Sequence, residues 1–180
     1  MVDSTSPRSI STEGQTAYLR KDYLAAAGRF NAAAAAYIQV GDALMAAEMH
    51  NNASVAYLQA GNAAAALDEV GDTPEIFAAA GDLRRQAIAV GNQAAALEGL
   101  KRVPEALVAY ELCADLFKHA GETDLRVHAM QARSALELRS GHQLQALATM
   151  KSGLDDLKKP SPKQRFLRRL LDIPFSMWKK

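Results

Sequence analysis

The chain repeats itself every 20 residues, and this period constrains its fold more than any other feature. Glycine recurs on one strict 20-residue grid, at Gly41, Gly61, Gly81, Gly121 and Gly141. Small residues recur on the same grid, at Ala26, Ala46, Ala66, Ala106 and Ala146. A fixed period of this kind is typical of helical repeat arrays, in which each unit buries its apolar face only by stacking on its neighbours.

Between the glycines, apolar residues follow the spacing of an α-helix. One stripe is Ala26, Phe30, Ala33 and Tyr37, and it recurs at Ala46, His50, Ala53 and Tyr57 and at Ala106, Tyr110, Cys113 and Phe117. The steps of four, three and four residues place each stripe on one helix face. Short turns force neighbouring helices to be antiparallel. We therefore predict an all-α solenoid of about eight helices, paired into hairpins of about 40 residues, plus a C-terminal helix.

The grid also predicts where the helices begin and end. A first helix starts near Ser11, and a second runs from Asp22 to Val40. Further long helices cover 42–60, 103–120, 122–140 and 142–157, and polar residues that can start a helix follow four of the glycines, at Asp42, Asn62, Asp82 and Glu122. Glycine in the left-handed conformation ends such helices without strain.

Two regions depart from this regularity. Between residues 61 and 101 glycine comes every ten residues, at Gly61, Gly71, Gly81 and Gly91, which predicts short or broken helices and the least stable part of the array. In 122–140 the stripe is interpreted as Leu125, Ala129, Ala132 and Leu136, one residue out of register. This slip would place Arg126 and Arg133 at the edge of the buried stripe.

The run from Lys21 to Ala33 resembles the second helix of a tetratricopeptide repeat. Tyr23, Ala26, Phe30 and Ala33 match the pattern of that family, and Ala106, Tyr110 and Cys113 match it again. The longer unit and the phrase Ala56–Asn62 resemble the soluble NSF attachment protein branch of such folds. Over roughly residues 12–157, the resemblance implies a right-handed superhelix whose concave face binds a peptide or helix of a partner.

A partner groove of this kind would lie on the first helix of each hairpin, over 42–60, 82–100 and 122–140. The candidate partner-binding residues are Met45, Met49, Asn52, Arg126, Met130 and Arg133. Methionine suits adaptable binding because its side chain is flexible and polarisable. The alternative is that the methionines are ordinary core residues and the arginines form a solvated face.

The sequence predicts no enzyme, no cofactor and no metal site. The four histidines lack metal-ligand spacing, and the glycines are isolated rather than gathered in a phosphate-binding loop. His50 falls in an aromatic slot of the repeat and is interpreted as a packed core ring. The single cysteine, Cys113, fits a small core position and a reducing compartment, so we expect a cytoplasmic protein.

The C-terminal segment differs from the rest of the chain in charge. Residues 158–180 carry eight basic residues and one acid, whereas residues 1–157 carry 13 basic and 19 acidic residues. A helix starting at Ser161-Pro162 would carry basic and apolar residues and be followed by an aromatic tail. The candidate docking residues are Arg165, Phe166, Arg168, Arg169, Leu170 and Trp178.

This segment has three interpretations. It caps the apolar face of the last repeat, or lies on an anionic membrane as in a peripheral membrane adaptor, or binds a partner's groove or this chain's own acidic surface. The predicted organisation is a disordered 1–10, a repeat domain over 11–157 and the basic segment 158–180. The function we expect is that of a protein–protein interaction scaffold, adaptor or small chaperone. Nucleic acid is disfavoured because the repeat body is acidic, and weak self-association through the array ends remains open.

Overall fold

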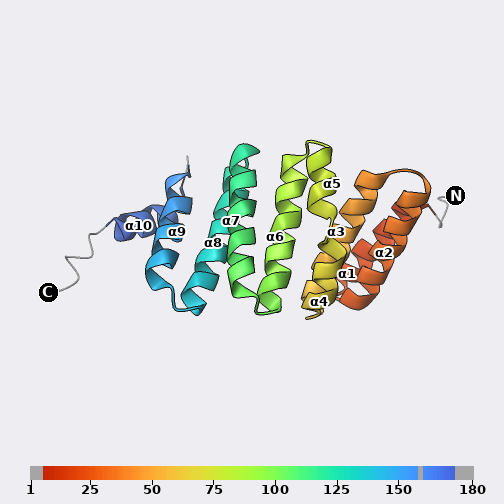
Figure 1. Cartoon of the computed structure of the whole chain (residues 1–180), viewed down its shortest axis with the longest axis horizontal. Coiled ribbons are helices and arrows are strands. Elements are labelled where there is room, and N and C mark those ends of the chain that lie inside the picture. The colour runs from red at the N-terminus through yellow and green to blue at the C-terminus, as the bar shows by residue number, and fades with distance from the viewer. Residues whose placement is uncertain (1–5, 158–159, 173–180) are drawn as a thin grey trace.

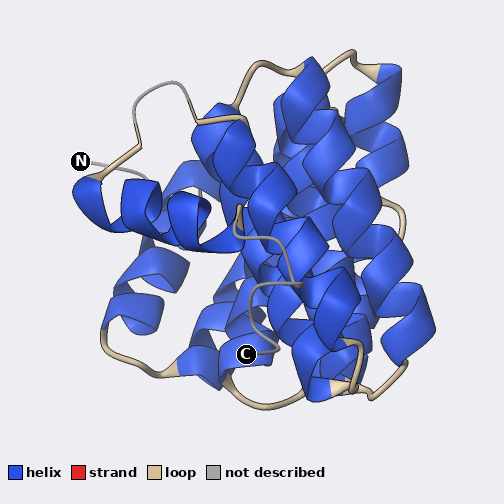
Figure 2. Ribbon diagram, turned by 90° about the vertical axis from the view of Figure 1, so that its left-hand side faces the viewer, coloured by secondary structure: helices blue, strands red, loops and turns tan. Residues whose placement is uncertain are grey.

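The chain folds into a row of antiparallel α-helices, and the computed structural model describes residues 6–157 and 160–172. Within these ranges there are ten helices and no strand (Figures 1 and 2). Their bounds are α1 Pro7–Leu19, α2 Tyr23–Gln39, α3 Ala43–Gln59, α4 Ala63–Val70, α5 Thr73–Ala79, α6 Leu83–Gly99, α7 Val103–His119, α8 Thr123–Arg139, α9 Gln143–Asp155 and α10 Pro162–Leu171. Consecutive helices pack along the long axis, with α1 near one end and α10 at the other (Figure 1).

The 20-residue register holds throughout the array. Helices α2, α3, α6, α7 and α8 are each 17 residues long and begin on the same phase of the grid. All five grid glycines have a positive φ, between 70° and 83°, as predicted for helix-ending residues. Between residues 21 and 141 the two remaining grid positions hold Lys21 and Lys101, whose φ values of 63° and 61° are also left-handed. The backbone therefore turns in the same way even where glycine is missing.

These lysines give a testable prediction about the turns. Replacing Lys101 with glycine should raise the free energy of unfolding by about 0.5 kcal/mol, because the left-handed penalty removed exceeds the extra unfolded-state entropy of glycine. Urea denaturation measures the change. Gly121→Lys, the matched exchange at an equivalent turn, should have the opposite sign. Equal destabilisation by both substitutions would show that backbone strain does not control these turns.

Four helices begin with the side-chain cap that the sequence predicts. Asp22, Asp42, Asn62 and Asp82 accept hydrogen bonds from the backbone N–H three residues later, at 3.3, 3.0, 3.2 and 2.9 Å. In Asp82 this bond, from the Arg85 N–H, holds the carboxyl pKa below its usual value. Glu122 precedes α8 without such a bond, and its carboxylate instead lies 2.9 Å from Nε of Arg84.

The first helix begins earlier than the sequence predicts. Ser6, not Ser11, is the cap residue, and its hydroxyl accepts from the N–H of Ser9 at 3.2 Å. Pro7 follows at the first helical position, where its fixed φ favours the helix and its missing N–H costs nothing. Residues 7–10 are therefore helical, so the predicted disorder of 1–10 is wrong there, and residues 1–5 lie outside the described ranges.

The predicted break in the middle is confirmed at one place. α4 and α5 together fill 63–79, the slot of a single long helix, and are separated at Gly71-Asp72. In a continuous helix the carbonyl of Val70 would accept from residue 74, but Pro74 has no N–H. The Thr73 hydroxyl donates to that carbonyl instead, at 2.9 Å, and Nε2 of Gln93 donates to the Gly71 carbonyl at 2.8 Å.

The second predicted break, at Gly91, is wrong. α6 is one continuous helix from Leu83 to Gly99. A Cβ at position 91 would lie 3.1 Å from Sγ of Cys113 on α7. This glycine therefore allows α6 and α7 to approach closely, and it does not end a helix.

Candidate partner-binding surfaces

Helix α8 carries a buried stripe that contains charged residues. Arg126 and Met130 are each 7 % exposed and Glu137 is 3 % exposed, while the Arg133 side chain is 24 % exposed. These four residues occupy the grid positions of Ala26, Phe30, Ala33 and Tyr37. The predicted stripe of Leu125, Ala129, Ala132 and Leu136 packs against the core as well. The prediction that Arg126 lies at the edge of the buried stripe is wrong, because this arginine is itself buried.

Carboxylates neutralise the arginines of this stripe. Arg126 pairs with Asp156 at the end of α9. Arg133 places Nη1 3.1 Å from Oε1 of Glu111 on α7, and Nε 3.1 Å from Oε1 of Glu137. We therefore correct the assignment of Arg126 and Met130 to a partner surface, since both are buried. Binding of a partner by the half-buried Arg133 stays a prediction.

The α3 candidates divide in the same way. Met49 is 2 % exposed in the core cluster between α2 and α3, so its assignment to a groove is also corrected. Met45 is half-buried and packs against that cluster. Asn52 is half-buried and lines a groove.

This groove, which we call the N-terminal groove, lies between α1 and α3. It has a volume of about 390 Å³ and is lined by Gln15, Tyr18 and Leu19 of α1, Phe30 of α2, and Asn52 and Val55 of α3. Leu19 is 82 % exposed, the highest value among the exposed large apolar side chains. Tyr18 stacks edge-on against Tyr23, with ring centroids 5.3 Å apart. The groove therefore combines apolar walls with two side-chain amides.

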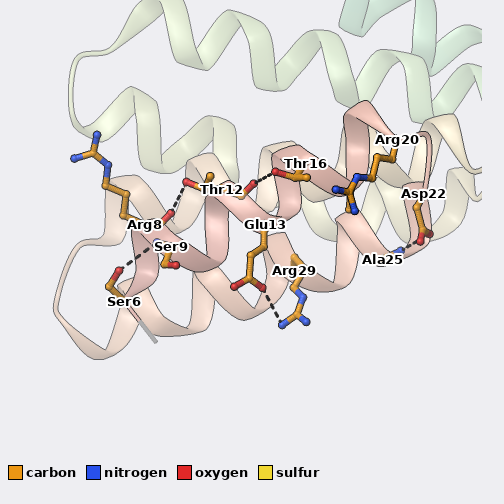
Figure 3. A pocket seen from close by; sticks show the side chains of 11 residues that line it. Ser6, Arg8, Ser9, Thr12, Glu13, Thr16, Arg20, Asp22, Ala25 and Arg29 are labelled. Atoms are coloured by element: carbon orange, nitrogen blue, oxygen red, sulfur yellow. Dashed lines mark hydrogen bonds and ion pairs between the residues drawn. The ribbon is translucent and has the colours of Figure 1, made fainter. Parts of the chain in front are cut away.

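A larger hollow lies between α1 and the first half of α2 (Figure 3), and its polar groups bond mainly to one another. Its volume is about 670 Å³. The hydroxyls of Thr12 and Thr16 donate to the carbonyls of Arg8 and Thr12, both at 2.9 Å, and Glu13 pairs with Arg29 at 3.4 Å. These internal bonds make the hollow a polar end surface of the array.

A third cleft, of about 390 Å³, opens between α3 and the broken α4–α5 segment. His50 lines it and is not the packed core ring that the sequence predicts, because its side chain is 36 % exposed. Glu69 accepts from Nδ2 of Asn31 at 2.6 Å and lies 2.8 Å from Nδ1 of His50. The histidine therefore links α3 to α4 through a carboxylate.

Polar bonds tie equivalent helices of successive hairpins together. Between α3 and α6, Arg85 Nη1 lies 3.2 Å from Oε2 of Glu48, and Asn92 donates to Asn51 at 2.8 Å. Between α6 and α8, Arg84 pairs with Glu122 and Arg139 pairs with Glu98. These bonds connect α3 to α6 and α6 to α8.

The C-terminal helix α10 begins as the sequence predicts. Ser161 and Gln164 form a reciprocal capping box, with bonds of 3.3 and 2.8 Å, ahead of Pro162 at the first helical position. Leu167 and Leu171 pack against the last core cluster, while Phe166 is 68 % exposed and Leu170 37 % exposed. The predicted docking residue Trp178 lies outside the described ranges.

The described residues show neither an activated thiol nor a metal-binding group. Burial raises the pKa of the Cys113 thiol to about 12, which keeps it protonated and unreactive. No group of three or more histidine, cysteine or acidic side chains in the described ranges could hold a metal ion. Among the described helices, none is both long and apolar enough to cross a membrane.

Comparison with known families agrees with this architecture. The profile of the family described as "Soluble NSF attachment protein, SNAP" matches residues 14–168 of the 180-residue chain. The chain belongs to the SNAP family. Its members are non-catalytic adaptors with a tetratricopeptide-like helical fold, so the resemblance, the fold class and the absence of enzymatic function predicted from the sequence are confirmed. No curated protein matches the chain.

The family match also bears on the organisation of this SNAP-family protein. It extends from within α1 into α10, past the boundary at residue 157 predicted from the charge change. The first part of α10 is thus continuous with the family domain. Four of the eight basic residues of 158–180 lie in this helix, namely Lys163, Arg165, Arg168 and Arg169.

Proposed function

We propose that this SNAP-family protein is an adaptor that binds a peptide or helix of a protein partner on its hairpin-first helices, α1, α3, α6 and α8. The N-terminal groove carries this proposal, because it offers an apolar floor and a highly exposed leucine beside two amides. A partner helix would insert apolar side chains over Phe30 and hydrogen-bond at the rim through Gln15 and Asn52. Met45 and Arg133 remain candidates for further contacts.

The fixed arrangement of these helices supports the proposal. Binding costs less when the surface is already in its bound shape, since fewer side chains and loops are ordered on association. Packing of α1 on α2 and of α2 on α3, around a core cluster that includes Phe30 and Met49, supplies such rigidity at the N-terminal groove. The adaptor would act in the cytoplasm, where its single cysteine stays reduced.

The test uses amphipathic helical peptides selected from a display library on the folded full-length chain. Leu19→Ser should weaken the best binder about tenfold, because an apolar anchor at the groove is lost. Fluorescence polarisation with labelled peptide gives the affinity. Leu144→Ser is the matched control, because Leu144 is 64 % exposed on α9, a hairpin-second helix.

The two variants separate the outcomes. Loss of binding by Leu19→Ser with normal binding by Leu144→Ser supports the N-terminal groove. Equal affinity of both variants and the unmodified chain would place the partner elsewhere and contradict the proposal.

A further inference from the structure

We infer that α10 docks on an anionic phospholipid membrane through its outer face, which consists of Lys163, Arg165, Phe166, Arg169 and Leu170. All five side chains are exposed. This inference goes beyond the proposed adaptor function, because it assigns a lipid ligand to the opposite end of the array from the N-terminal groove (Figure 1).

Some apolar residues of α10 pack against the core of the array, and others are exposed to solvent. Leu167 and Leu171 pack against the cluster of Val127, Leu154 and Leu157. Phe166 and Leu170 are not covered by that contact and remain 68 % and 37 % exposed. Capping the array and docking on a membrane, which the sequence leaves as alternatives, therefore use different residues of one helix.

The charge around the exposed apolar pair is positive. Arg165 and Arg169 lie on the outer face with Lys163, and the acid nearest in sequence, Asp172, lies 2.6 Å from Nζ of Lys151. That bond raises the Lys151 pKa and ties the end of α10 to α9. Apolar residues between basic ones are the composition that binds at the interface of an anionic membrane.

Another exposed apolar pair shows that exposure alone does not define this surface. Val108 and Leu112 on α7 are 68 % and 49 % exposed and have the same four-residue spacing as Phe166 and Leu170. Their exposed neighbours are acidic, Glu111 and Asp115, and an anionic membrane would repel them. The positive charge beside Phe166 and Leu170 therefore favours α10 over α7 as the surface that binds an anionic membrane.

The placement of α10 also favours a membrane over an acidic protein. Viewed from its own end of the array, α10 lies crosswise to the upright helices (Figure 2). The groove between α8, α9 and α10 is lined on the α10 side by Leu167, Gln164 and Lys163 rather than by Phe166. Phe166 and Leu170 thus lie away from this groove and Lys163 lies at the border between the two, and a lipid surface needs no matching shape.

The test is cosedimentation of the full chain with phosphatidylcholine vesicles, with and without phosphatidylserine. We expect salt-sensitive binding to the phosphatidylserine vesicles only. Phe166→Ser with Leu170→Ser should weaken that binding about tenfold or more, as should Arg165→Gln with Arg169→Gln. Val108→Ser with Leu112→Ser should leave it unchanged.

The outcomes are distinct. Loss of binding in both α10 variants with retention in the α7 variant supports the inference, provided that circular dichroism shows equal helicity. No binding of the folded chain to phosphatidylserine vesicles would overturn it. Binding that survives both α10 variants would overturn it too. The assay contains no protein partner, so its failure leaves the adaptor function untouched.

Discussion

Replacing Phe77 with alanine should lower the free energy of unfolding by about 3–5 kcal/mol, a large part of the 5–15 kcal/mol typical of a folded domain. Phe77 is 1 % exposed and forms a cluster with Ala47, Val70 and Ala89. The Arg85 guanidinium lies 5.5 Å from its ring centroid. Because α5 is a helix of seven residues, it depends on this packing rather than on its own stability.

Chemical denaturation measures the loss, and hydrogen exchange locates it. Amides of α5 should exchange faster in Phe77→Ala than in the unmodified chain. Phe166→Ala is the matched control, since the same change at a side chain 68 % exposed should cost less than about 0.5 kcal/mol. Similar losses in the two variants would mean that the ring of Phe77 does not hold α5.

Replacing Arg133 with alanine should cost about 3 kcal/mol, because it leaves the carboxylate of Glu137 buried without its partner. Glu137 is 3 % exposed, and its contact with Nε of Arg133 is 3.1 Å long. Glu111, the second partner of this arginine, has a side chain 57 % exposed and so tolerates the loss. The sequence alone places Arg133 at the edge of the buried stripe, as a candidate partner-binding residue.

The control removes both charges. Arg133→Met with Glu137→Leu keeps most of the buried volume and should restore much of the stability, since no unpaired charge remains. Thermal denaturation of the single and double variants gives the comparison. If Arg133→Ala kept its melting temperature and weakened partner binding, the original surface interpretation would be right.

The regular parts of the fold follow from short-range patterns that the sequence displays directly. Grid glycines mark the turns, and Asp42 or Asn62 marks the next helix start, because both effects depend on local backbone chemistry. The break before Thr73 follows in the same way from Gly71 and Pro74. The failures occur where distant residues decide. Gly91 lies inside α6, where Sγ of Cys113 on α7 leaves little room for a side chain.

The candidate site was harder to predict for a similar reason. By its residue type Arg126 is expected at the surface. Its burial depends on an ion pair with Asp156, which lies 30 positions later in the sequence. The N-terminal groove requires α1 and α3 to be placed relative to each other, and no pattern within either helix encodes that separation. In α10 the periodicity predicts which residues form the apolar face, but the residues of that face that contact the last core cluster are known only from the structure.

The constant register has a consequence for how such an array can change in length. The left-handed turns from residue 21 to residue 141 all fall on the same 20-residue phase, so inserting or deleting one hairpin would keep the spacing of the remaining turns. The N-terminal groove and the outer face of α10 would keep their own residues, and the span between them would change by one unit. The distance between the two ends can therefore change by whole hairpins while the residues at each end stay the same.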